Sequence, residues 1–163
     1  MLFRSNAVGA ILIQPDLSCE IIADGHHVHP DLVRLLVRDK PDTNIVLVTD
    51  ALKPTAQKKG PFFANNEEVY FSDGIFLRAS DHVIAGSSLT MLDGLRNLVS
   101  YGIPMEVAVK MASPNPARIL HLTRMGEISP GFQADMTLLT REFQVLASMV
   151  KGEFVYGGER KQG

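Results

Sequence analysis

An unbroken run of apolar and β-branched residues, I-V-L-V-T at positions 45–49, leads directly into Asp50. Such a run is typical of a strand buried on both faces, as strands of parallel sheets are. Parallel strands need covering helices, so the run favours an α/β fold. Ligands bind at the carboxyl ends of strands in these folds, which is where Asp50 lies. We therefore predict a catalytic carboxylate at Asp50; a helix cap or turn residue is the alternative interpretation.

The residues before this run predict a strand and then a helix. Residues 18–23 read as a short strand that Asp24 and Gly25 end as a turn. Pro30 suits the first position of a helix over 30–38, in which leucines recur at helical spacing. The order strand, helix, strand predicts a parallel pair joined by a right-handed crossover.

Beyond Asp50 the pattern predicts a polar loop, a hairpin and three helices. Ser72-Asp73-Gly74 is a strong hairpin signal between residues 67–71 and 75–77. Ser87 or Ser88 is the expected N-cap of a helix over 89–99, with Gly102 beyond its end. A second helix is expected over 104–112, a third from Asn115 as its cap through Leu120, and strands over 134–139, 143–150 and 153–156.

Composition narrows the classes of function. A chain of 163 residues with a net charge of −2 gives no electrostatic argument for nucleic acid or an anionic membrane. The single cysteine, Cys19, excludes an internal disulfide and a cysteine zinc cluster, which suits a reducing compartment. No apolar run approaches ~20 residues and the first residues lack the layout of a signal peptide, so we expect a cytoplasmic protein.

Five motifs carry a resemblance to a known family: D-G-H-H-V-H at 24–29, L-V-T-D-A at 47–51, A-G-S-S-L-T-M at 85–91, S-P-N-P-A-R at 113–118 and G-E-I-S-P-G-F-Q-A-D at 126–135. In order and approximate spacing the chain resembles the N-acetylglucosamine-6-phosphate deacetylases of the amidohydrolase superfamily. The resemblance covers nearly the whole chain, but only the C-terminal part of the family.

The resemblance implies a distorted (β/α)8, or TIM-like, metal-dependent hydrolase barrel with a small β-sandwich. The strands at 18–23 and 44–49 would be the seventh and eighth of the barrel, and 127–156 a share of the sandwich. Because a full barrel takes ~250 residues, we expect a fragment or a truncated homologue. We assign residues 1–125 to a partial barrel and 126–163 to the C-terminal sandwich strands.

The resemblance also implies a reaction, the hydrolysis of the acetamide of N-acetylglucosamine 6-phosphate to glucosamine 6-phosphate and acetate. Asp50 would take a proton from a metal-bound water and pass it to the departing nitrogen. The family binds a divalent metal of the zinc or iron type through a Glu and two His on earlier strands. We expect those ligands to be absent from this chain, so we predict no metal ligands here and no activity for the isolated chain. Bulk water is far less acidic than metal-bound water, whose pKa is about 7, so an Asp base cannot readily deprotonate it.

The histidine cluster, which comprises His26, His27 and His29, allows more than one interpretation. By resemblance, Asp24, Gly25, His26 and His27 line the sugar site, and His27 contacts the substrate near its carbonyl. His-Val-His also looks like a metal-binding motif of amidohydrolases, but that motif belongs to the first barrel strand and no third ligand accompanies it. Adventitious metal binding and an uninvolved surface histidine stay open, and we regard His26 and His29 as structural or solvent-facing.

The remaining predicted contacts to the sugar phosphate come from two separate segments. Ile84, Ala85 and Gly86 match a loop that touches the sugar in the family, and a glycine there permits close approach of backbone to ligand; a plain turn before a helix is the alternative. Arg4 is matched to an arginine that binds the phosphate, although its spacing to Val8-Gly9 is one residue short.

Two other classes of function remain. The first is a non-catalytic barrel fragment whose open strand edge is covered by another copy of the chain or by a separate N-terminal half. The second is a nucleotide-binding α/β domain, because strand 44–49 with Asp50 resembles a Walker B strand. No phosphate-binding glycine loop accompanies it, which argues against the second class.

Overall fold

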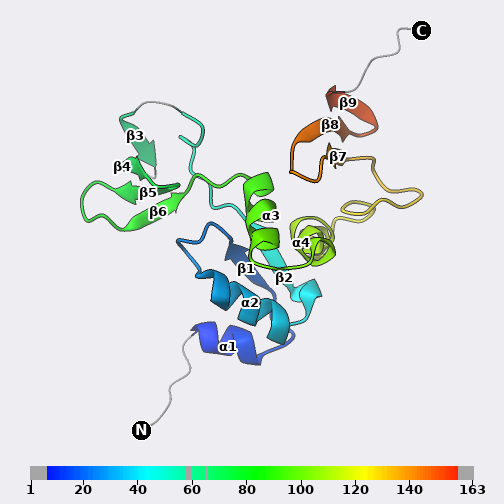
Figure 1. The fold of residues 1–163 in the computed structure, drawn as a ribbon, viewed down its shortest axis with the longest axis horizontal. Coiled ribbons are helices and arrows are strands. Elements are labelled where there is room, and N and C mark those ends of the chain that lie inside the picture. Colours follow the sequence, from blue (N-terminus) through cyan, green and yellow to red (C-terminus); the bar gives the residue numbers. More distant parts are fainter. Residues whose placement is uncertain (1–6, 58–59, 65, 158–163) are drawn as a thin grey trace. The chain divides into compact units, whose positions relative to one another are not determined.

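The computed structural model describes residues 7–57, 60–64 and 66–157 (Figure 1). Within this part the chain forms two compact units that divide between Ala112 and Ser113. These units are defined by how the residues pack together within each one. The predicted domain boundary after residue 125 is a separate matter and stays a prediction.

The first unit is built on a parallel strand pair. Strands β1 (Cys19–Ile22) and β2 (Ile45–Val48) pair in parallel, with Cys19 opposite Ile45. They are joined by α2 (Pro30–Asp39) and the short 3-10 turn η1 (Asp42–Asn44). Ile45 and Leu47 are almost fully buried, as the apolar run predicts. The predicted order strand, helix, strand is confirmed, and the carboxyl ends of both strands meet at one edge.

Helix α2 begins where its sequence predicts and ends at Asp39, one residue later than predicted. Pro30 is the first residue, and the His29 side chain caps the helix by accepting from the Asp31 N–H. Val33 and Leu36 are its buried face. His29 therefore has a structural role, as expected.

A further helix, α1 (Ala7–Ile13), precedes β1. The sequence offers no start signal for it. Lys40 is 4% exposed, and its ammonium donates to the backbone carbonyls of Ile11 and Gln14 and so satisfies groups at the end of α1.

A small antiparallel sheet of four strands follows Asp50. Its order is β3 (Phe62–Ala64), β4 (Glu67–Ser72), β5 (Ile75–Arg78) and β6 (Ile84–Ser87). The predicted hairpin is confirmed, and its turn residues Asp73 and Gly74 both have positive φ, +52° and +88°, as a type I′ turn requires. β6 also reaches back to the strand edge, through a parallel bridge between Ser87 and Ala51.

Two helices pack on β2, namely α3 (Met91–Ser100) and α4 (Met105–Ala112). The predicted N-cap of α3 is wrong, because the cap is Thr90 and neither Ser87 nor Ser88. Both serine hydroxyls are engaged elsewhere: Ser87 donates to the Thr49 carbonyl and Ser88 to the Gly74 carbonyl. Gly102 lies beyond the helix end at φ +87°, as predicted.

The second unit combines one helix and a three-stranded antiparallel sheet. Helix α5 (Pro114–Ile119) starts after Ser113, so the predicted start at Asn115-Pro116 is wrong by two residues. The predicted strands are confirmed as β7 (Met136–Leu139), β8 (Val145–Val150) and β9 (Glu153–Tyr156), in that order in the sheet. Across the described residues, no helix has the length and apolarity needed to cross a membrane.

Candidate active site

Asp24 holds the loop that follows β1. One of its carboxylate oxygens accepts from the backbone N–H groups of His26 and His27, both at 2.9 Å. The other lies 2.7 Å from Nδ1 of the His27 ring. The Asp24 side chain is only 5% exposed. Both oxygens are thus occupied by the protein, and Asp24 orients His27 and leaves little surface for a ligand.

The pKa of Asp24 reflects two opposing effects. Burial raises it, but the hydrogen bonds from the His27 and His26 amides and the His27 ring lower it by more. The net result is a pKa below the ordinary value of an aspartic acid, so Asp24 is a carboxylate at neutral pH. A carboxylate on Nδ1 fixes that nitrogen as a donor and turns Nε2 outward.

His27 lies between two carboxylates. Its Nε2 is 3.8 Å from Oδ2 of Asp50, which is within ion-pair distance but too long for a hydrogen bond. The Asp50 side chain is 49% exposed and that of His27 19%, so both are accessible from solvent. The structure therefore brings together the two residues that the sequence singles out most strongly, from the ends of β1 and β2.

Asp50 has an unusual backbone conformation. Its φ is +50°, in the left-handed region that costs energy for a residue with a Cβ, although Asp tolerates it better than most. The Asp50 carbonyl accepts from the N–H of Ser87 at 2.8 Å. The alternative that Asp50 caps a following helix does not apply, because residues 52–57 form turns and no helix.

The other predicted sugar-site residues divide into three groups. Gly25, with φ +81°, makes the turn after Asp24, and the His26 ring is exposed beside Gly74. Ile84 and Ala85 are at least partly exposed on β6, whereas Gly86 is buried against Asp50 and Leu52: a Cβ on it would lie 2.9 Å from the Asp50 carbonyl oxygen. Arg4 lies outside the described residues.

Helix α3 supports this loop with residues that the sequence did not suggest. Asn97 donates from its side chain to the Ala23 carbonyl at 2.8 Å. The Tyr101 hydroxyl lies against Gly25, and burial first and the charge of Asp24 second raise its pKa. Asn97 lies within α3 and Tyr101 follows its last residue, and nothing in the sequence distinguishes these positions from those of other polar residues, so only the fold could identify them.

The described residues do not form a metal site. No group of three His, Cys, Asp or Glu side chains that could hold an ion occurs among residues 7–57, 60–64 and 66–157. Asp24 and His27 Nδ1 bind each other, which leaves His27 Nε2 and Asp50 as two donors where a zinc site needs three or four.

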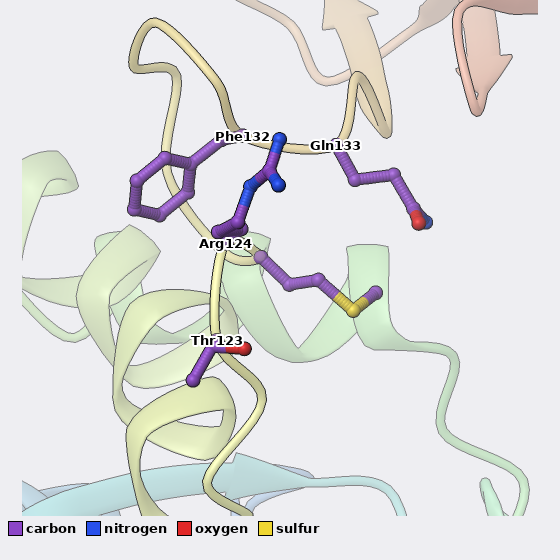
Figure 2. Close-up of a pocket in the computed structure, with 5 residues that line it drawn as sticks. Thr123, Arg124, Phe132 and Gln133 are labelled. Carbon is purple, nitrogen blue, oxygen red and sulfur yellow. The ribbon is translucent and has the colours of Figure 1, made fainter.

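Cavities in the described chain also lie outside this cluster. One of about 390 Å³ in the first unit is lined by residues that include Pro54, Gln57, Phe71 and Thr90. Another of about 420 Å³ in the second unit is lined by Thr123, Arg124, Met125, Phe132 and Gln133 (Figure 2). Arg124 Nε donates to the Gly131 carbonyl, and its own carbonyl accepts from the Gln133 N–H, so Arg124 holds this loop together. None of the predicted site residues lines either cavity.

Comparison with known proteins identifies the class to which this fold and site belong. Residues 9–155 match the amidohydrolase family, and the chain belongs to this family. Its members are generally metal-dependent hydrolases. Relatives that match the chain include amino-sugar phosphate deacetylases, as the sequence motifs suggest.

An N-acetylglucosamine-6-phosphate deacetylase from Vibrio furnissii is 34% identical to the chain. The match covers 91% of this chain and 37% of the relative's length. A deacetylase of N-acetylgalactosamine 6-phosphate from a Shewanella species is 33% identical over 94% of the chain and 39% of the relative. The crystal structure of N-acetylglucosamine-6-phosphate deacetylase from Thermotoga maritima superposes with a TM-score of 0.87 at 30% identity, over 93% of this chain and 42% of that one. The resemblance and the predicted α/β fold class are confirmed, and the chain spans about two fifths of these relatives.

Proposed function

We propose that this chain carries the proton-transfer half of an N-acetylglucosamine-6-phosphate deacetylase site, with Asp50 as general base and then general acid. The observation that carries the proposal is the His27 ring, held on one side by Asp24 at 2.7 Å and facing Asp50 on the other at 3.8 Å. A carboxylate and an imidazole in this arrangement can both reach the same substrate amide during proton transfer.

The reaction balances with these groups. Water adds through its oxygen to the acetamide carbonyl carbon while Asp50 takes one of its protons. The carbon–nitrogen bond then breaks, and Asp50 returns that proton to the departing amine, which yields glucosamine 6-phosphate and acetate. His27, held by Asp24 through Nδ1, turns Nε2 toward the same acetamide and contacts the substrate near its carbonyl.

The acidity of water limits what this part of the site can do alone. An ordinary aspartate is a weak base, with a pKa of ~3.9, and bulk water is a far weaker acid, so direct deprotonation of water by aspartate is strongly uphill. We infer that the complete site uses a divalent metal of the zinc or iron type to activate water. The described residues do not fit such an ion, so we assign no step to it. We expect no turnover by the purified 163-residue chain, and turnover free of host deacetylase would overturn this expectation.

A chimera tests the function itself. The chain replaces the matching 37% of the Vibrio furnissii deacetylase, and hydrolysis of N-acetylglucosamine 6-phosphate is measured. We expect Asp50→Asn to lower kcat by about 10²–10⁴-fold. Asp73→Asn is the matched control, because Asp73 has nearly the same conformation, φ +52° against +50°, in the turn between β4 and β5. Equal activity of the two variants would refute the assignment of Asp50.

The proposal also specifies which amino-sugar phosphate is the substrate. Relatives named for the glucosamine and for the galactosamine substrate match the chain about equally well. The chimera should therefore be assayed with both sugar phosphates, and a higher kcat/KM for N-acetylglucosamine 6-phosphate is the expected result.

The open edge of the barrel strands favours a second, non-catalytic property. Among the described strands, β1 pairs with β2 alone, and such an edge invites another strand. We infer that the chain assembles with itself or with a separate N-terminal half. A monomeric mass by light scattering for the well-folded chain would count against this.

The buried thiol of Cys19 suits a reducing compartment, and we retain the cytoplasm as the proposed location.

A further inference from the structure

Ser87 is the residue on which the conformation of Asp50 depends most directly. It has no exposed surface, and each of its polar groups is hydrogen-bonded. Its N–H donates to the Asp50 carbonyl at 2.8 Å, and its own carbonyl accepts from the Leu52 N–H at 3.0 Å. Its hydroxyl donates to the Thr49 carbonyl and accepts from the Leu89 N–H at 2.9 Å.

These contacts fix both backbone dihedrals of Asp50. The Thr49 carbonyl lies in the peptide plane before Asp50, and the Asp50 carbonyl lies in the plane after it. With both planes held, neither φ nor ψ of Asp50 can rotate freely. A left-handed Asp persists only where its surroundings over-determine it. Ser87 supplies that constraint from both sides.

Gly86, the residue before Ser87, allows β6 to lie close to the residues that follow β2. Its bare Cα lets β6 approach so closely that an added Cβ would lie 2.7 Å from the Leu52 side chain and 2.9 Å from the Asp50 carbonyl oxygen. The pair Gly86-Ser87 therefore places β6 against the end of β2, where an ordinary pair of residues could not approach.

From this geometry we propose that Ser87 is a positioning residue, whose hydroxyl keeps the Asp50 carboxylate opposite Nε2 of His27. It touches neither substrate nor the reacting atoms. The proposal rests on the proposed function only in treating Asp50 as the reactive group.

The next residue offers a matched control. Ser88 also donates its hydroxyl to a backbone carbonyl, that of Gly74 at 2.8 Å, but this carbonyl belongs to the turn between β4 and β5. Ser88→Ala removes the same kind of bond without releasing either peptide plane of Asp50.

The test is a double-mutant cycle read by NMR, and it needs no turnover. Asp50→Asn is introduced into the full chain with Ser87 intact, with Ser87→Ala and with Ser88→Ala, and the ¹⁵N shift of His27 Nε2 is recorded at one pH. Replacing a carboxylate 3.8 Å away should move this resonance with Ser87 intact and in the Ser88→Ala background. In the Ser87→Ala background the effect of Asp50→Asn should fall by at least half.

An undiminished effect in the Ser87→Ala background would overturn the proposal, as would an equal loss in the Ser88→Ala background. If Ser87→Ala does not fold, Ser87→Cys takes its place, because a thiol is only a weak donor, and the same halving is expected. If Ser87 had a purely structural role, Ser87→Ala would lower the melting temperature without changing the effect of Asp50→Asn on the His27 Nε2 shift. Failure of the proposed function would appear instead as an Asp50→Asn chimera that keeps its activity.

Discussion

At the scale of single residues, Asp24 shows how the chain converts a sequence motif into geometry. The motif suggests a residue that lines the sugar site, whereas the carboxylate is buried and binds the His27 ring and two amides. Spacing along the sequence could indicate that Asp24 and His27 act together. It could not indicate that one orients the other, because that depends on the turn made by Gly25.

Asp24→Asn should lower stability in a pH-dependent way. An amide keeps one acceptor oxygen but loses the charge-assisted bond to His27, which is worth about 1.5–3 kcal/mol. Because the folded pKa of Asp24 lies below its unfolded value, its contribution is complete above the unfolded pKa of ~3.9 and is lost as pH falls through the folded pKa. Urea unfolding should show a gap between the two proteins at pH 6 that narrows below about pH 4. A gap that stays constant with pH would contradict this account, and the exposed Asp31→Asn serves as the control.

Gly86→Ala should be more costly than an ordinary glycine substitution. Overlap with Leu52 and the Asp50 carbonyl adds to the cost, for a total of about 2–4 kcal/mol. Gly102→Ala is the control, since its φ of +87° is strained but its surroundings are open; we expect about 1–2 kcal/mol there. Equal losses in chemical unfolding would show that the contact between β6 and Asp50 is looser than the structure indicates.

At the scale of elements, the local sequence predicts most helices and strands but not the contacts that they make with distant segments. The apolar run before Asp50, the proline start of α2 and the Asp-Gly turn after β4 are all local signals, and each is confirmed. The start of α3 was misplaced because Ser87 and Ser88 look like caps in sequence, yet their hydroxyls bond to distant carbonyls. The approach of β6 to Asp50 has no local signal, since it joins residues almost forty positions apart.

Helix α1 should depend on a single buried ammonium. Lys40 donates to the carbonyls of Ile11 and Gln14, which the helix itself cannot satisfy. Lys40→Met keeps most of the apolar length and removes both bonds, at a cost of about 1–3 kcal/mol. Amide hydrogen exchange should accelerate in α1 while β1 and β2 are little changed. The exposed Lys53→Met should leave both regions unaffected; loss of protection across the whole first unit would contradict this prediction.

At the scale of the whole molecule, the chain brings a carboxylate and an imidazole to one strand edge, and no group of three metal-binding side chains occurs among its described residues. It belongs to the amidohydrolase family and spans about two fifths of the three deacetylases described above. The two barrel strands suffice to place Asp50 and His27, because parallel strands end at the same edge. The fold class and this pair could be predicted from sequence, since both depend on strand order and motif. The supporting contacts of Ser87, Asn97 and Tyr101 required coordinates.

The most direct test of this account is the kcat/KM of the chimera with Asp50→Asn, His27→Asn and both together. If the two side chains act as one unit over 3.8 Å, the double variant should lose no more than about tenfold beyond the more damaged single variant. If the two losses instead multiply, Asp50 and His27 act independently, and the central claim is wrong.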